Sequence, residues 1–443
     1  MRHALNQFLS QKRIAGGAFV LAATQLGASL CGFLRDRSFA MVFPFESDPI
    51  GIASVYIAAF RPSDVLFQII VMSSLSVVLV PFLASHLAHG RHREMNAVTS
   101  SVLIVFGALF TIVALIMAFF FPWIAPYMVK FTGESLALYI SFGRLALLTN
   151  ALFVVGNTAG QYLIAKQQYW IYGITPILWS LGTIGGIHVL SPIIGPLGPM
   201  VGTICGTVIY VVIRCVGIYR IGFRFTLASN GWIHGDIGQM GWLILPRMVA
   251  LGGLQMQLLL FDRLASGLEK GAVAINQFAS NVESVIPGIV GIALAQSTFS
   301  LLSQAHATSE RSRFRHTLLR AMRYNLLLTL PGAAAVMLLP QVAAWLLHLD
   351  PQSGETFMQS LVIYAVAIPF ESANHLLLRS FYALKNTAIP ACSSICSAIV
   401  GVSVAYVSIG TVGIFSLAMG YVALQISQTI LLGALLTLRM RRA

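Results

Sequence analysis

Apolar residues recur along the chain in long runs of 18 or more, separated by short polar stretches that hold most of the charge. A helical run of this length spans a hydrocarbon core about 30 Å thick. We therefore predict an all-α integral membrane protein with about twelve spans, at residues 14–35, 51–86, 97–121, 136–164, 170–190, 196–219, 238–263, 271–303, 319–347, 357–384, 387–409 and 412–437. The polar stretches between the spans are too short for a soluble domain.

The predicted spans 51–86 and 271–303 are longer than a straight perpendicular helix needs, so we expect them to tilt or bend. Proline is the expected cause of a bend because it removes a backbone hydrogen bond. The prolines in these two spans are Pro62, Pro81 and Pro287. The sixth span carries glycines at a spacing that lets another helix approach closely, at positions Gly198, Gly202 and Gly206.

The composition supports a membrane protein and excludes most soluble enzymes. Mean hydropathy is +0.82 and only 9% of residues are charged, against about 25% in soluble proteins. The net charge is +13, but the basic residues lie between apolar runs, so anionic membrane lipids are expected partners and nucleic acid is not. The chain lacks the short motifs of zinc, dithiol, dinucleotide and P-loop sites. We therefore expect a transporter with no cofactor, and no ATP-driven pump on this chain.

The positions of lysine and arginine predict the orientation in the membrane. At or near the span ends they divide 19 to 5 between the two sides, and three lie inside spans, at Arg61, Arg144 and Arg247. The more basic side includes both ends of the chain. Both termini are therefore predicted to be cytoplasmic.

An Asp-Arg pair follows the first predicted span and returns after the seventh. Asp36-Arg37 and Asp262-Arg263 lie 226 positions apart, about half the chain. Charged residues at span ends commonly anchor a helix at the interface. We therefore expect Asp36, Asp262 and Arg263 to be interfacial anchors on the outer side.

This repeat divides the chain into two halves, which we predict to be six-helix lobes at residues 1–225 and 226–443. Six is an even number of spans, so both halves would enter the membrane from the same side. The two lobes are then expected to be related by a pseudo-two-fold axis along the membrane normal. This organisation is typical of a duplicated transporter.

Charged residues inside the spans indicate where the transport chemistry lies, because an uncompensated charge at mid-bilayer costs at least about 2.5–3.5 kcal/mol. A water-filled cavity between the lobes would hydrate these groups. Arginine suits a phosphate or pyrophosphate ligand because its planar guanidinium forms two parallel hydrogen bonds. The residues predicted to bind such a substrate are Arg35, Arg61, Arg144 and Arg247, and those predicted to couple transport to a proton or sodium ion are Asp64, Glu283 and Glu371.

Each of these residues also has a structural interpretation. Arg61 and Asp64 lie three positions apart on one helix face, where they can neutralise each other. Glu371 has His375 one turn further along and can hydrogen-bond it. Arg247 follows Pro246 and can satisfy carbonyl groups that the proline leaves without a donor.

Several motifs together resemble the MurJ/MviN lipid II flippases of the multidrug/oligosaccharidyl-lipid/polysaccharide exporter superfamily. They are Gly32-Phe33-Leu34-Arg35-Asp36, Ala59-Phe60-Arg61-Pro62, Asp262-Arg263-Leu264-Ala265-Ser266, Ile286-Pro287-Gly288-Ile289-Val290-Gly291 and Arg379-Ser380-Phe381-Tyr382-Ala383. The resemblance covers nearly the whole chain. It implies two six-helix lobes around a central cavity, working by alternating access in the bacterial inner membrane.

The chain also departs from the pattern that the resemblance implies. That family has fourteen spans, against twelve predicted here. Four positions where the family carries a charged cavity residue are uncharged in this sequence, namely Ser29, Ser54, Phe67 and Asn281. Among the family's charged cavity residues, Arg35 is retained.

Three hypotheses for the function follow. The leading one is a monomeric flippase for a polyprenyl-pyrophosphate-linked oligosaccharide of the cell envelope, either lipid II or an exopolysaccharide repeat unit. The alternative is an ion-coupled multidrug or cation exporter of the same superfamily, which the arginines disfavour and Glu283 and Glu371 favour. The third is a carrier with another six-plus-six fold. Residues 87–93 only faintly resemble the loop motif that is usual in such carriers.

Overall fold

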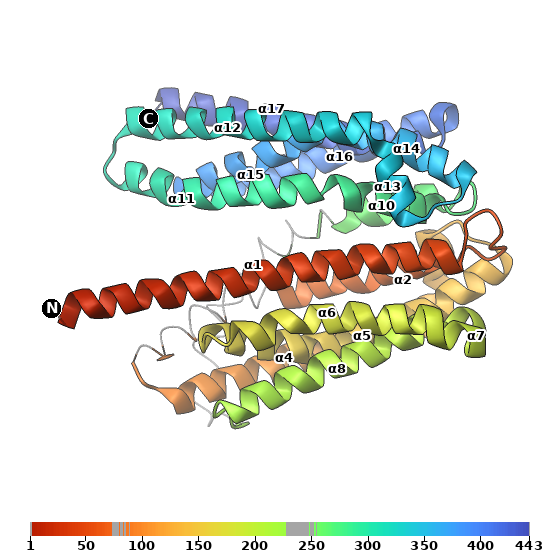
Figure 1. Cartoon of the computed structure of the whole chain (residues 1–443), viewed down its shortest axis with the longest axis horizontal. Helices are drawn as coiled ribbons and strands as arrows, with labels where there is room; N and C mark the ends of the chain where they lie inside the picture. The colour runs from red at the N-terminus through yellow and green to blue at the C-terminus, as the bar shows by residue number, and fades with distance from the viewer. Residues whose placement is uncertain are drawn as a thin grey trace. The chain divides into compact units, whose positions relative to one another are not determined.

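All regular secondary structure in the described part of the chain is helical (Figure 1). The computed structural model describes residues 2–72, 79, 83, 86–87, 89–226, 248, 252–253 and 255–442. Among these residues, eight helices are long and apolar enough to cross a membrane, or nine if one bent pair counts as a single span. The all-α membrane class is therefore confirmed, and the number twelve stays a prediction.

The chain divides into two compact units. Unit 1 contains Met1–Val42, Ala59–Ala125 and Ala137–Met248. Unit 2 contains Val249–Ala443 together with two shorter segments from the first half, Phe43–Ala58 and Pro126–Leu136. The lobes predicted at 1–225 and 226–443, and the pseudo-two-fold axis between them, stay predictions.

The first half of the chain, which supplies unit 1 and the two shorter segments of unit 2, consists mainly of long helices. Their bounds are α1 (Arg2–Val42), α2 (Ile52–Phe67), η1 (Gln68–Met72), α4 (His92–Met128), α5 (Gly133–Ala165), α6 (Tyr169–Gly185), η3 (Gly186–Leu190), α7 (Ser191–Ile194), η4 (Gly195–Leu197) and α8 (Gly198–Arg220). Pro62 lies inside α2, and the helix widens into the π-helical turn η1 one residue after it ends. The second span is therefore irregular just after Pro62, and the expected bend stays a prediction, since Pro81 lies outside the described residues.

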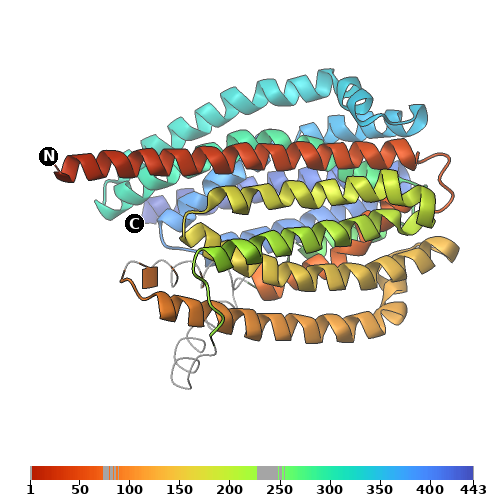
Figure 2. The same ribbon diagram turned by 60° about the horizontal axis from the view of Figure 1, so that its bottom comes forward.

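Glycines allow α6 and α8 to pack backbone to backbone in antiparallel directions. A Cβ built on Gly202 would lie 2.4 Å from the Cα of Gly186, and one on Gly206 would lie 3.2 Å from the Cα of Gly182. Figure 2 shows the two helices side by side along their length. The predicted packing role of the glycine ladder is confirmed, and the apolar stretch Tyr169–Arg220 folds back on itself.

Unit 2 continues with shorter and more broken helices. They are α10 (Ala272–Glu283), η5 (Pro287–Gly291), α11 (Ile292–Ala307), α12 (Arg311–Leu338), α13 (Pro340–Leu347), α14 (Pro351–Ala365), α15 (Ile368–Ala383), α16 (Ala388–Val412) and α17 (Phe415–Arg442). The antiparallel pair α16 and α17 meets at Gly401 and Gly420, where a Cβ on either glycine would lie within 2.7 Å of the other's carbonyl oxygen.

Breaks in unit 2 occur where proline removes a backbone donor. The eighth predicted span is interrupted between Glu283 and Pro287, where the π-helical turn η5 begins. The tenth consists of α14 and α15, which bend by 42° just before Pro369. The ninth ends early, because Pro340 starts the separate helix α13. Most of the seventh predicted span, 238–263, lies outside the described residues.

Candidate functional site

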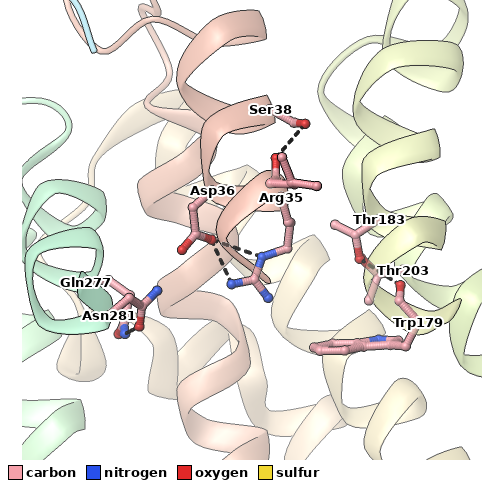
Figure 3. Close-up of polar contacts among 9 residues, drawn as sticks. Arg35, Asp36, Ser38, Trp179, Thr183, Thr203, Gln277 and Asn281 are labelled. Carbon is pink, nitrogen blue, oxygen red and sulfur yellow. Dashed lines mark hydrogen bonds and ion pairs between the residues drawn. The ribbon is translucent and has the colours of Figure 1, made fainter. Parts of the chain in front are cut away.

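Arg35 lies in α1 and folds back onto its neighbour Asp36 (Figure 3). Its Nε and Nη2 donate to one carboxylate oxygen of Asp36, at 3.1 and 2.7 Å. The Asp36 side chain is only 5% exposed, against 21% for Arg35. The interfacial-anchor prediction for Asp36, and likewise for Asp262 at 3% exposure, is therefore wrong, since these carboxylates are packed inside the protein.

Asp64 belongs to a polar contact between α2 and α5 in unit 1. The Asn150 side-chain amide donates to the Asp64 carboxylate at 3.0 Å and also hydrogen-bonds Ser63. Ser63 in turn donates to the carbonyl oxygen of Ala146 at 3.1 Å. Arg61, one turn before Asp64, is partly exposed. An amide from the neighbouring helix therefore orients the Asp64 carboxylate.

Of the other two predicted substrate arginines, the structure describes Arg144 alone. Arg144 is exposed on α5, and its Nε donates to the carbonyl oxygen of Ala118 in α4 at 2.9 Å. This bond ties the exposed Arg144 side chain to the neighbouring helix α4. Arg247 lies outside the described residues, so its predicted role stays a prediction.

The structure brings Glu283 and Glu371 together inside unit 2. Glu283 ends α10 and is fully buried, and its carboxyl faces that of Glu371 in α15, close enough for the two charges to repel. Among the described residues, neither Glu283 oxygen has a hydrogen-bond partner of ordinary geometry. The Tyr421 hydroxyl of α17 donates to Glu371 Oε2 at 2.5 Å. Sequence analysis singled out both acids but could not place them side by side.

Aromatic residues extend this acidic pair into a network across four helices. The rings of Tyr421 and Tyr364 lie 5.2 Å apart, and the Tyr364 hydroxyl donates to Asn276 Oδ1 of α10 at 2.8 Å. His375, one turn after Glu371, lies close enough to interact electrostatically with it. The network therefore joins α10 to α14, α15 and α17.

A buried arginine that sequence analysis did not single out lies in unit 1. Arg214 in α8 is 1% exposed. It donates to Thr175 Oγ1 at 2.8 Å and to the carbonyl oxygens of Tyr172 and Gly156 at 2.9 and 3.1 Å. The Tyr210 and Tyr172 rings lie 4.0 and 4.5 Å from its guanidinium carbon. Its position near a span end concealed it, because such arginines usually reach water.

The two units therefore carry different chemistry. Unit 1 presents guanidinium groups that can hydrogen-bond a phosphate, and unit 2 holds a buried carboxyl pair that can take up a proton or a cation. Within the described residues, no group of three or more His, Cys, Asp or Glu side chains could hold a metal ion.

Comparison with known sequences places the chain in a family. The model of the family "Lipid II flippase MurJ" matches residues 51–442. A "Probable lipid II flippase MurJ" of Rhizobium meliloti (strain 1021) is 26% identical over 404 residues, covering 86% of this chain and 72% of that protein. The corresponding protein of Vibrio cholerae is 23% identical over 405 residues, covering 86% and 74%.

Solved structures show the same fold. The inward closed conformation of lipid II flippase MurJ aligns with a TM-score of 0.79 at 17% identity, over 95% of this chain and 87% of that chain. An inward-facing multidrug resistance MATE family transporter of the MOP superfamily aligns with a TM-score of 0.78 at 14% identity, over 94% and 95%. The resemblance seen in the sequence motifs is thus confirmed, and the chain belongs to the lipid II flippase MurJ family.

Proposed function

We propose that this chain is a flippase that moves a polyprenyl-pyrophosphate-linked oligosaccharide across the bacterial inner membrane by alternating access, with lipid II as the first substrate to test. The observation that carries the proposal is the family match over residues 51–442. An exopolysaccharide repeat unit shares the same polyprenyl pyrophosphate and is the other substrate within this proposal.

Arg35 is the residue that we assign most directly to the pyrophosphate. Its present partner, Asp36, offers a single oxygen to two guanidinium nitrogens. A pyrophosphate carries more negative charge and can accept parallel hydrogen bonds, so it competes with Asp36 for Arg35. Arg61, Arg144 and Arg247 complete the proposed substrate set, each to be tested singly.

Ion coupling is the second part of the proposal. Two carboxylates held against each other away from water are unfavourable when both are charged, so Glu283 and Glu371 require a proton or a sodium ion to neutralise them. Tyr421 fixes the position of Glu371 for this exchange. Asp64, oriented by Asn150, is the proposed counterpart in unit 1.

The arrangement in the membrane also belongs to this proposal. Twelve spans, two lobes at 1–225 and 226–443, cytoplasmic termini and a monomeric carrier are its elements. The excess of basic residues at the span ends on one side supports the orientation.

Reconstituted protein tests the substrate. Proteoliposomes with fluorescent lipid II inside should expose it outside, and Arg35→Lys should slow exposure about tenfold or more, because one charge-assisted hydrogen bond contributes roughly 1.5–3 kcal/mol. Arg220→Lys, an exposed arginine at the end of α8, is the matched control. Wild-type protein that moves no lipid-linked sugar would contradict the proposal.

Two observations favour a second candidate function, an ion-coupled multidrug or cation exporter. The fold matches a MATE transporter almost as well as MurJ, and unit 2 holds an acidic pair with aromatic neighbours. Export of a fluorescent organic cation by the same proteoliposomes, without exposure of lipid II, would establish this alternative.

A further inference from the structure

A small pocket with a basic rim lies at one end of unit 2, away from the carboxyl pair. It encloses about 240 Å³ where α11 ends, α12 begins and α17 ends. Figure 1 shows the turn between α11 and α12 and the end of α17 at the same end of this unit. Its lining consists of Ala305, His306, Ser309, Arg311, Phe314, Leu384, Arg439 and Met440.

The rim of the pocket is cationic. Arg311 and Arg439 line it together with His306, and among the described residues none of the three forms an ion pair with an acid. The nearest acid in the sequence, Glu310, is paired with Arg313 at 3.4 Å instead. The pocket therefore offers two uncompensated guanidinium groups to an anion.

The backbone holds this rim in place through a tight turn. Glu310 N–H donates to the carbonyl oxygen of Ala305 at 2.9 Å, and Ser309 N–H donates to that of His306 at 3.1 Å. Ser309 reaches this turn with a φ of 57°, in the left-handed region. His306 and Arg311 are thus held on either side of one tight turn of the chain.

The floor of the pocket is apolar and rigid. Buried Phe314 packs in a core cluster with residues of α11, α15 and α17, and Leu384 and Met440 pack against the same cluster. The candidate spans end or begin at this level, at Ala307, Arg311 and Met440. A basic rim above an apolar floor at the ends of spans lies at the depth of lipid phosphates.

We propose that this pocket binds the phosphate headgroup of an anionic phospholipid, with Arg311 and Arg439 on the phosphate and Phe314, Leu384 and Met440 against the glycerol and first methylene groups. The chemistry is charge-assisted hydrogen bonding to phosphate combined with apolar contact, which a free phosphate ion cannot use. The site is separate from the proposed transport residues and does not depend on the identity of the transported substrate.

Native mass spectrometry of the purified full chain tests the site. With phosphatidylglycerol added, Arg311→Gln/Arg439→Gln should retain on the order of tenfold less of the tightest-bound lipid than wild type. The matched control is Arg320→Gln/Arg323→Gln, two exposed arginines of the same helix that do not line the pocket. Equal loss in both double variants, or no loss in the first, would overturn the proposal.

Two further experiments use wild-type protein, so they do not depend on whether the variants fold. The first distinguishes a phospholipid headgroup from a free phosphate compound as the ligand. Phosphatidylglycerol should displace bound lipid from wild type, whereas phosphatidylcholine and glycerol 3-phosphate should not. Competition by glycerol 3-phosphate at equal concentration would show a free-phosphate site instead. A photoactivatable phosphatidylglycerol should label Phe314, Leu384 or Met440 in wild-type protein, and labelling spread evenly over the lipid-facing helices would contradict the assignment.

Discussion

Single residues in this protein show that a charge in a membrane helix needs a partner and that the partner decides its role. Arg35 has a carboxylate beside it, Arg144 has a carbonyl oxygen, and Arg214 has three oxygens and two aromatic rings. Only the first of these partners is one that an anionic substrate readily replaces. Arg214 is therefore structural, and Arg35 is the better candidate for function.

Replacing Arg214 should destabilise the protein without a direct effect on substrate. Arg214→Lys keeps the charge but cannot form the three hydrogen bonds from a planar fork. The loss of at least one buried charge-assisted bond predicts a decrease of roughly 1.5–3 kcal/mol in the free energy of unfolding. Thermal unfolding in detergent measures it, with Arg220→Lys as the exposed control. An unchanged transition temperature would show that the lysine finds equivalent partners.

Replacing the acids of unit 2 should remove the dependence of transport on the coupling ion. Glu371→Gln keeps the shape but no longer offers a carboxylate to Tyr421, and Glu283→Gln removes the charge that opposes Glu371. Each variant should flatten the response of transport to pH and sodium titrations. Wild-type response in both variants would separate the acidic pair from coupling. Gln359→Glu serves as a control for a change of charge outside the acidic network, because Gln359 lies on an exposed face of α14.

At the scale of elements, small residues and prolines determine how closely helices pack and where they break. The α6–α8 pair depends on glycine at positions where a Cβ would meet backbone atoms, which cannot move aside as a flexible side chain can. The bend between α14 and α15 and the π-helical turn at Pro287 surround the acidic pair. Irregular helix near buried carboxyls is a common feature of transport sites.

The close approach of α6 and α8 predicts opposite effects for two neighbouring glycines. Gly202→Ala should destabilise by about 1–3 kcal/mol, since its Cβ would lie 2.4 Å from the Cα of Gly186. Gly185→Ala has no atom within 4 Å of its Cβ and should be neutral or stabilising by up to about 1 kcal/mol. Thermal unfolding of both variants measures the difference. Equal transition temperatures would contradict the close packing.

Asp350 caps the N-terminus of α14 and predicts a pH-dependent contribution to stability. Burial opposes its charge, but hydrogen bonds from Ser353, together with Glu46 and the Phe45 backbone, prevail and hold the pKa of Asp350 below its usual value. Because the pKa of Asp350 is lower in the folded state than in the unfolded state, its carboxylate stabilises the folded protein at pH values above the unfolded-state pKa, near 4. This stabilisation is lost as the pH falls through the folded-state pKa.

Removal of this cap gives the test. Asp350→Ala should lower the free energy of unfolding by about 1 kcal/mol at pH 7, and the difference from wild type should shrink below about pH 4. Unfolding curves at the two pH values measure it. Asp350→Asn should retain most of the cap at pH 7, because its amide oxygen can accept the Ser353 N–H. A difference that is constant with pH would show that the carboxylate charge plays no part.

At the scale of the whole molecule, family membership and fold agree, although identity to the MurJ structure in its inward closed conformation is only 17%. The bilayer itself requires long apolar helices, so the fold tolerates changes in many charged positions. Ser29, Ser54, Phe67 and Asn281 illustrate this, since all lack the charge that the family resemblance implies. The substrate site is therefore the part that must be tested directly.

The predicted orientation can be tested by cysteine labelling. Ser309 and Glu355 are exposed and lie at opposite ends of unit 2 helices, in the α11–α12 turn and near the start of α14. In a variant with the five native cysteines replaced by serine, a membrane-impermeant maleimide should label Glu355→Cys from outside intact cells and Ser309→Cys only after lysis. The reverse pattern would overturn the assignment of both termini to the cytoplasm.

The sequence by itself determined the class of protein, the helix break at Pro287 and the packing glycines. These are local properties, set by the length of an apolar run, a missing N–H or a missing Cβ. The motifs around Arg35, Pro287 and Arg379 also determined the family. Such features can be recognised without knowing which helices are neighbours.

Only the tertiary structure decided which charges meet. Glu371 and Tyr421 lie 50 residues apart in the chain, and nothing in their own helices indicates the contact. Asp36 and Asp262 look like interfacial anchors by position but are buried, and Arg214 looks like a span-end arginine but lies among carbonyls and aromatic rings. The energy of a charge depends on its surroundings in three dimensions, because burial removes water and neighbouring helices supply the replacement partners.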